Sequence, residues 1–231
     1  MADGNSRFSR LLDLATVVMI ALAIIIGLRN SWNRPQRDGR SSIVNQDVKE
    51  WRGYTNASFR VGANTAKYTI VEFSDFACVY CQRMAPIVRR VREEIGEDVT
   101  FVYRHAMFRP NSRPLALATE CAARQGVAEA LHDELFSSRG SLPSDGWPMA
   151  ALRAGARDTI KFKLCLASAD AASAVLDDSI ATANLGVRGT PTFLLNNILV
   201  EGSLSAEDMK ELLGVKPNMM AKIRRLLVLQ K

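Results

Sequence analysis

Two cysteines three positions apart, Cys78 and Cys81, constrain the fold of this chain more than any other feature. The apolar, β-branched run at 69–73 precedes them and predicts a buried strand, while the apolar spacing after them predicts a helix. Two cysteines at the start of a helix can close a small, reversible disulfide. The free N–H groups and the dipole of the helix stabilise a thiolate at the first position, so the pattern is typical of redox chemistry.

A second signal lies far along the chain, in the stretch Gly189-Thr190-Pro191-Thr192-Phe193. The apolar runs at 192–195 and 198–200 flank Asn196-Asn197, which predicts two strands joined by a two-residue hairpin turn. A proline at the start of a hairpin is a weak signal alone. Together with the cysteine pair it is much more specific.

The remaining elements follow from periodicity and from turn residues. A short helix is expected at 44–51, an edge strand at 57–61 and a further strand at 99–103. Pro86 falls inside the helix that follows the cysteines, so we expect a kink there. Helices are expected at 114–124, 127–136, 148–154, 158–167 and 171–185. Ser205 begins a capping pattern for another helix.

Length and charge narrow the possible functions. The 231 residues leave room for one or two domains, and an apolar fraction of 48% is that of an ordinary globular protein. The net charge is +6, but Lys and Arg are scattered among Asp and Glu rather than clustered with aromatic residues. This distribution argues against nucleic acid as a partner.

An apolar segment lies near the N-terminus. Residues 14–28 contain no charged side chain, and Leu11 and Leu12 extend the segment past Asp13. We predict a transmembrane anchor at 11–28, between a short tail at 1–10 and a linker at 29–50. A cleaved signal peptide and a buried core helix are the alternatives. The segment is long for a signal peptide, and Gly27-Leu28-Arg29 is a poor cleavage site.

The orientation of this anchor rests on two opposing arguments. Lys and Arg are more frequent after the segment than before it, which favours a cytoplasmic domain. Long domains cross the membrane largely regardless of such charges, however, and disulfides persist in the periplasm but rarely in the cytosol. The four cysteines allow three pairings, of which Cys78 with Cys81 is the local one. We therefore expect a single-pass protein of the bacterial inner membrane whose domain faces the periplasm or another extracytoplasmic space.

Residues from about 54 to 214 resemble the DsbA-like branch of the thioredoxin superfamily, which comprises extracytoplasmic thiol–disulfide oxidoreductases with a helical insertion. Three stretches carry the resemblance: VEFSDFACVYC at 71–81, FVYRH at 101–105 and GVRGTPTF at 186–193. The resemblance implies an α/β, thioredoxin-like fold at 51–216, with an all-helical insertion at about 113–185. A separate basic helix is expected at 217–231. Val79-Tyr80 departs from the family, in which Pro often comes first or His second.

The resemblance also implies roles for residues at the site. Cys78 would be the exposed nucleophile, and Cys81, one helical turn further on, would be shielded and would resolve the mixed disulfide. Glu72 would lie beneath the disulfide as proton acceptor for the resolving thiol. The alternative for Glu72 is a carboxylate that faces solvent on an edge strand.

Thr190-Pro191 resembles the cis-proline loop of the same family, in which the backbone before the proline pairs with an incoming peptide. The residues expected to contact a substrate are Val79, Tyr80, Arg188, Gly189 and Thr190. The alternative is an ordinary trans proline at the start of a strand.

Cys121 and Cys165 lie on expected helices of the insertion, where some DsbA-like proteins have a second, structural disulfide. The alternative is two unpaired buried thiols. A zinc site would require two further ligands beside Cys78 and Cys81. His105 and His132 are the only histidines and neither forms a paired ligand motif, so we expect no metal and no cofactor beyond the redox disulfide.

The sequence thus predicts a membrane-anchored thiol–disulfide oxidoreductase that introduces disulfides into exported proteins. Its expected partners are reduced client proteins and a membrane protein that reoxidises or reduces the cysteine pair. One alternative is a disulfide isomerase or a thiol reductant, for example in cytochrome maturation. Another is a membrane-tethered peptide-binding or chaperone module whose disulfide is structural.

Overall fold

The computed structural model describes Met19 and residues 46–138, 141, 143 and 145–216. The expected anchor at 11–28, apart from Met19, and the expected basic helix at 217–231 lie outside the described residues. Within the described ranges, no helix has the length and apolar character needed to cross a membrane. The elements below all belong to one of the two compact units of the chain, Ser41–Lys231.

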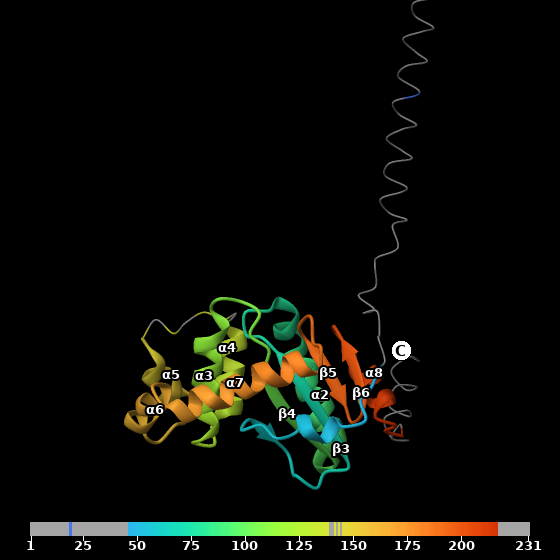
Figure 1. The fold of residues 1–231 in the computed structure, drawn as a ribbon, viewed down its shortest axis with the longest axis horizontal. Coiled ribbons are helices and arrows are strands. Elements are labelled where there is room, and N and C mark those ends of the chain that lie inside the picture. The colour runs from blue at the N-terminus through green and yellow to red at the C-terminus, as the bar shows by residue number, and fades with distance from the viewer. Residues whose placement is uncertain (1–18, 20–45, 139–140, 142, 144, 217–231) are drawn as a thin grey trace, which may run out of the picture. The chain divides into compact units, whose positions relative to one another are not determined.

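A six-stranded mixed sheet in the order β1-β6-β5-β3-β4-β2 forms the centre of this unit (Figure 1). The strands are β1 (Gln46–Asp47), β2 (Arg60–Val61), β3 (Tyr68–Ser74), β4 (Val99–His105), β5 (Thr192–Leu195) and β6 (Ile198–Glu201). Strand β3 runs parallel to β4 and antiparallel to β5. The cysteine pair follows β3, so it lies at the end of a central strand.

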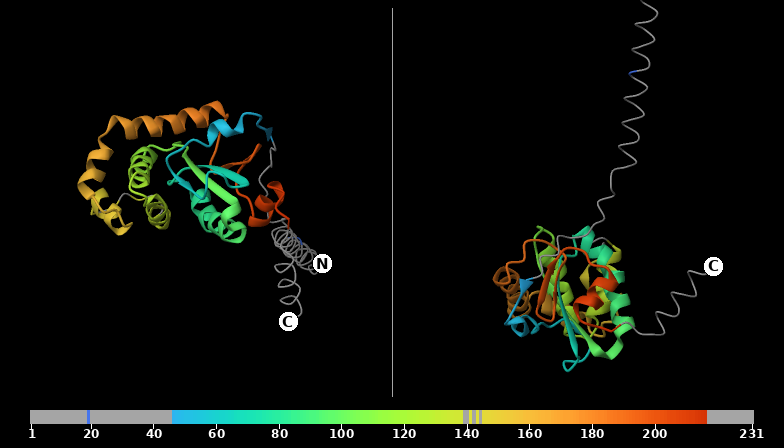
Figure 2. Two further views of the ribbon diagram at one scale, coloured as in Figure 1. Left: turned by 90° about the horizontal axis from the view of Figure 1, so that it is seen from below. Right: turned by 90° about the vertical axis from the view of Figure 1, so that its right-hand side faces the viewer.

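Side chains of β3 are buried on both faces of the sheet. Ile70 packs into the larger hydrophobic cluster, which includes Met84 and Val88 of α2 (Val79–Ile95). Val71 and Phe73 pack into a second cluster on the opposite face, with Ala181 of α7 (Ala169–Asn184) at its margin. Figure 2 shows α2 and α7 on opposite sides of the strands. Helices cover both faces of β3, which accounts for its burial along nearly its whole length, although Thr69, Glu72 and Ser74 are polar.

The helical insertion lies between β4 and β5. It consists of α3 (Ser112–Ala123), α4 (Ala128–Ser137), α5 (Trp147–Arg153), α6 (Thr159–Leu166) and α7, and α8 (Ala206–Leu212) follows the sheet. Short 3-10 turns occur at η1 (Trp51–Tyr54) and η2 (Gly96–Asp98). Ser205 caps α8 in a complete capping box with Asp208, as the sequence predicts.

One expected element is wrong. The helix at 44–51 is absent from the described part of this stretch, where Gln46–Asp47 forms β1 and helical turn begins only at Trp51. Gln46 and Asp47 pair with Leu199 and Ile198 at the edge of the sheet. Backbone pairing with β6 therefore overrides the local pattern, and the sheet extends into the range assigned to the linker.

A disulfide joins the first and fourth helices of the insertion. Cys121 of α3 and Cys165 of α6 have their Cα atoms 5.8 Å apart and are 44 residues apart in sequence. The bond cross-links two helices that are separated by 44 residues of chain. It therefore also restricts the conformations of the insertion in the unfolded state.

We expect the double variant Cys121→Ser, Cys165→Ser to lose about 4 kcal/mol of unfolding free energy, because the cross-link no longer restricts the unfolded chain. Urea denaturation of both proteins in a Cys78→Ala, Cys81→Ala background without reductant measures the difference, since no free thiol can then exchange with the bond. Equal unfolding midpoints would show that this bond contributes nothing to stability.

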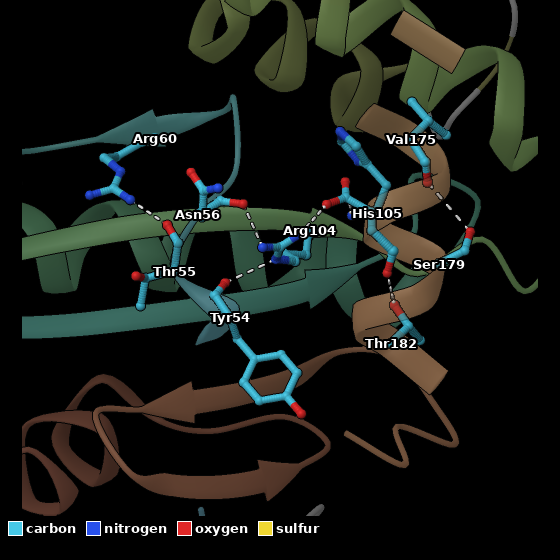
Figure 3. A network of polar contacts seen from close by, with 10 residues as sticks. Tyr54, Thr55, Asn56, Arg60, Arg104, His105, Val175, Ser179 and Thr182 are labelled. Carbon is cyan, nitrogen blue, oxygen red and sulfur yellow. Dashed lines mark hydrogen bonds and ion pairs between the residues drawn. The ribbon is translucent and has the colours of Figure 1, made fainter. Parts of the chain in front are cut away.

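A buried ion pair attaches the last helix of the insertion to the sheet. Arg104 of β4 donates from Nη1 to Asp178 Oδ1 of α7 at 2.9 Å, and the backbone N–H of His105 donates to Asp178 Oδ2 at 3.0 Å. The other guanidinium donors bind the carbonyl oxygens of Tyr54 at 2.9 Å and Asn56 at 2.6 Å. Figure 3 shows Arg104 between these two carbonyls and α7. One arginine thus connects three segments.

Candidate redox site

Cys78 lies at the junction of β3 and α2. It is the N-cap residue of α2 with an extended backbone (φ −94°, ψ 119°), and its carbonyl oxygen accepts from the N–H of Gln82 at 3.1 Å. Cys81 lies within the first turn, on the face of α2 that packs into the core. Both cysteines are free thiols in this structure. The geometry places one sulfur at the N-terminus of a helix and the other beneath it.

The loop before β5 reaches the first of these sulfurs. Phe73 pairs with Thr192 in the sheet, which brings the preceding loop to the end of β3. The Thr190–Pro191 peptide bond is cis, and the Thr190 carbonyl oxygen lies 3.2 Å from Cys78 Sγ. Thr192 Oγ1 donates to the carbonyl oxygen of Gly189 at 2.8 Å, which closes the loop on itself.

The expectation that Cys78 is exposed is wrong. The residue is 2% exposed in the reduced protein. Its backbone is fixed by the turn that begins at Asp75, and the loop with Thr190 lies against its sulfur. The neighbours Val79 and Tyr80 are instead the exposed residues, at 50% and 55%. The position of Cys78 at the start of a helix predicts an exposed residue. The loop that covers Cys78 is 112 residues away in sequence, so it could not be anticipated from the helix.

The two thiols have opposite electrostatic environments. The pKa of Cys78 is lowered to about 5, chiefly by a hydrogen bond from the Cys81 thiol. Burial opposes this shift, and the Thr190 side chain and the backbone N–H groups of Cys81 and Tyr80 add to it. The pKa of Cys81 is raised, first by burial, then by Cys78 and by the charge of Glu72. At neutral pH the pair therefore carries its negative charge on Cys78.

Glu72 occupies the centre of the sheet and is 1% exposed, which excludes the alternative of an edge carboxylate facing solvent. Neither carboxyl oxygen has a hydrogen-bond partner among the described residues. Burial raises the pKa of Glu72 to about 7. The charge of Glu72 contributes to the raised pKa of Cys81, so the two groups interact electrostatically.

Asp75 is a site residue that the sequence analysis missed. Its carboxylate accepts four hydrogen bonds: from Ala77 N at 2.8 Å, Ser112 Oγ at 2.7 Å, Phe108 N at 3.1 Å and Arg109 Nη1 at 3.2 Å. It therefore ties the turn before Cys78 to the loop between β4 and α3. The signal was an Asp directly after an apolar strand, where Asp commonly binds the backbone two residues on.

Asp75→Ala should lower the unfolding free energy by about 3 kcal/mol, because it leaves buried donors without their charged acceptor. Urea denaturation measures the loss. Asp170→Ala removes an exposed carboxylate from α7 and serves as the matched control, with an expected change within about 0.5 kcal/mol. A loss no larger than that of the control would mean that Asp75 does not hold the two loops together.

The histidines lie near the site but not on it. His132 of α4 is surrounded by the rings of Phe59, Phe76, Tyr103 and Phe136. Burial lowers the pKa of both His132 and His105, so both rings are neutral at pH 7. Within the described ranges, no three His, Cys, Asp or Glu side chains come together as metal ligands. The aromatic cage around His132 is best explained as packing.

The remaining predicted residues lie around Cys78, on the two segments that cover its sulfur. We call this surface the mouth of the site. Arg188 is exposed and Gly189 and Thr190 are half-buried, on the loop that contacts Cys78. Val79 and Tyr80 flank the sulfur from the helix side. The structure thus brings together every predicted site residue except Cys121 and Cys165, which lie in the insertion.

The sheet, the cysteine pair at the start of α2 and the proline loop define a domain with the fold of thiol–disulfide oxidoreductases. The family model described as Thioredoxin matches residues 55–214, and the chain belongs to that family. A curated relative, the Na(+)/H(+) antiporter NhaA 3 of Salinispora tropica, is 32% identical over 152 residues. That match covers 63% of this chain and 22% of the relative, so the chain spans about a fifth of its length.

Two solved structures show the same fold. A thioredoxin-like oxidoreductase from Silicibacter pomeroyi DSS-3 has a TM-score of 0.59 and 24% identity, covering 68% of this chain and 91% of its own. Oxidised BdbD from Bacillus subtilis has a TM-score of 0.61 and 22% identity, covering 74% of this chain and 96% of its own. At these identities the similarity shows the architecture alone.

Proposed function

We propose that this protein is an extracytoplasmic thiol–disulfide oxidoreductase that introduces disulfides into exported proteins through Cys78 and Cys81. The observation that carries the proposal is the asymmetry of the pair. One sulfur, with its pKa lowered to about 5, lies against the carbonyl of Thr190, while the other is buried with its pKa raised. A structural disulfide requires no such difference between its two sulfurs.

The exchange begins with the oxidised pair. A client thiolate attacks Cys78 Sγ, the bond to Cys81 breaks, and the electron pair leaves on Cys81. The Cys81 sulfur takes a proton, and the nearby Glu72 carboxyl supplies it in this direction and accepts it in the reverse direction. The client's second thiolate then attacks the client sulfur of the mixed disulfide and releases Cys78 as a thiolate. The client loses two electrons and the cysteine pair gains them.

The ionised state of Cys78 favours oxidation of clients over their reduction. A thiolate that the folded protein stabilises is a good leaving group, and it also stabilises the reduced form of the pair. The disulfide form is therefore the stronger oxidant. A reduction potential near or above about −180 mV supports this direction, whereas a value below about −270 mV supports a reductant or a structural bond.

The cellular setting belongs to the same proposal. Residues 11–28 anchor the chain in the bacterial inner membrane, with the domain in the periplasm or another extracytoplasmic space. A partner protein in the membrane reoxidises the pair after each turnover. Protease accessibility of the domain in sealed spheroplasts tests its location: cleavage without lysis supports the periplasmic side, and protection contradicts it.

Trapping of clients in cells tests the proposed activity. In the Cys81→Ala variant the mixed disulfide at Cys78 has no resolving thiol, so disulfide-linked client complexes accumulate. The double variant Cys78→Ala, Cys81→Ala is the matched control. Exported proteins with cysteines, recovered with the single variant and released by a reductant, support the proposal. Equal recovery with both variants, or none with either, contradicts it.

A further inference from the structure

The surface around Cys78 carries arginines and few acidic side chains. Three segments meet there: residues 76–92, 104–119 and 179–200. Cys78 Sγ lies 3.2 Å from Thr190 O, which joins the first segment to the third, and Phe108 N of the second segment donates at 3.1 Å to Oδ2 of Asp75, the residue directly before the first segment. None of the three segments contains an Asp or a Glu, although all three contain arginines. Acidic residues do border the segments. Asp75 has a fully buried side chain that four donors already occupy, and Asp178 is buried in its pair with Arg104. Further along α2, Arg89, Arg90 and Arg92 pair with Asp133, Glu94 and Glu129.

Three exposed arginines belong to this mouth. The Arg83 guanidinium lies 5.8 Å from the centre of the Tyr80 ring, and Arg188 is two residues before Thr190. Arg109 binds Asp75 at 3.2 Å and remains 43% exposed, so its charge is partly balanced. Among the described residues, neither Arg83 nor Arg188 forms an ion pair within 4 Å. The N-terminus of α2 adds a further partial positive charge.

The same mouth exposes apolar side chains. Val79 and Tyr80 follow Cys78, and Phe108, which is 48% exposed, lies on the loop that Asp75 holds beside the Cys78 turn. Three large apolar side chains around one reactive sulfur suit contact with a peptide more than contact with water or a small thiol. Arginine and aromatic side chains together are also typical of protein–protein contacts.

We infer that this mouth selects protein segments whose cysteine is flanked by Asp or Glu together with apolar side chains. The inference rests on the proposed exchange activity and names the chemistry of its substrates. Uncompensated arginines at the rim accelerate the approach of an acidic segment and disfavour a basic one. The effect acts mainly on association, so it weakens as salt is added.

Matched peptides test the inference. Three dithiol peptides share one Cys-x-x-Cys core and apolar neighbours, and they differ in flanking residues: Asp and Glu, Asn and Gln, or Lys. The oxidised full chain in neutral detergent is mixed with each, and the rate of its reduction is measured. Because acidic neighbours raise the pKa of the peptide thiol, each rate is divided by that peptide's rate with a neutral small disulfide.

At low salt the acid-flanked peptide should react on the order of ten-fold faster than the Lys-flanked one, and the ratio should fall below about two at about 0.5 M salt. In the double variant Arg83→Gln, Arg188→Gln the low-salt ratio should fall to about two or three. Arg157→Gln removes an exposed arginine from the insertion instead, and it should keep the full ratio.

The possible outcomes separate this inference from the activity on which it rests. Exchange at equal normalised rates for all three peptides overturns the charge preference and leaves the oxidoreductase proposal standing. No exchange with any peptide overturns both. If phosphatidylglycerol in the detergent micelles slows all three peptides alike, and does so only with both arginines present, the charge serves a lipid surface and the inference is wrong.

Discussion

Glu72→Leu is expected to slow thiol–disulfide exchange by on the order of a hundred-fold, because Cys81 then loses the carboxyl group that supplies or accepts its proton. The same substitution should stabilise the fold at alkaline pH. Leucine has a similar volume, and it removes two buried carboxyl oxygens that have no hydrogen-bond partner among the described residues. One variant is thus expected to gain stability and lose activity.

The sign of the pH effect follows from the pKa of Glu72, which burial raises from 4.5 to about 7. Below pH 4 the carboxyl is protonated in both the folded and the unfolded chain, so burial costs little. As the pH rises towards 7, the unfolded chain releases the proton first and the native protein loses stability. Above pH 7 the loss is complete and amounts to about 3 kcal/mol.

Urea unfolding of the reduced proteins at pH 5 and pH 8 measures this effect. The stability of Glu72→Leu relative to the parent should increase by about 2–3 kcal/mol between the two pH values. Other titrating groups are common to both proteins and cancel in the difference. A pH-independent difference would contradict the raised pKa, and undiminished exchange rates would contradict the catalytic role.

Asp178→Ala should lower the unfolding free energy by about 3–5 kcal/mol, because it leaves the buried guanidinium of Arg104 without its counter-charge. Urea denaturation measures the loss. Asp177→Ala is the matched control, since its side chain is the exposed neighbour on the same helix. Unfolding of both variants at the same urea concentration would mean that the ion pair contributes nothing.

Replacing both partners of the ion pair tests whether the loss comes from the unpaired charge. Arg104→Met with Asp178→Leu removes both charges together, and it should recover most of the stability that Asp178→Ala loses. The ion pair and the hydrogen bonds of the guanidinium would then be absent, while the bond from Tyr103 N to Phe59 O and the pairing of β2 with β4 remain. Hydrogen exchange along β4 and α7 would show whether the insertion still moves with the sheet as one unit.

Much of the fold could be predicted because its signals are local. The strand, the cysteine pair and the helix follow one another directly, and the Asn196-Asn197 turn and the Ser205 cap each depend on a few adjacent residues. The two-residue strand β1 could not be predicted in this way, since only its pairing with β6 makes it a strand. Its sequence has too few residues for any periodicity.

The same difference between local signals and long-range contacts applies to the residues of the site. Cys78, Cys81 and Pro191 follow from short motifs. Of the four donors of Asp75, only Ala77 N is local, whereas Phe108, Arg109 and Ser112 come from a segment that only the folded chain brings near. Arg104 and Asp178 likewise meet across 74 positions of the sequence. Nothing in either stretch marks the other as its partner, so buried polar contacts of this kind require the three-dimensional structure.

The ionisation of Cys78 is the central claim, and the pH dependence of its alkylation tests it most directly. The measurement uses folded protein with the Cys78–Cys81 pair reduced and the Cys121–Cys165 bond intact, and mass spectrometry assigns the modified sulfur. The rate with iodoacetamide should rise with a midpoint near pH 5, as the lowered pKa requires. A midpoint near that of free cysteine, about 8.5, would contradict the account. So would a Cys78 that reacts only after the protein is unfolded.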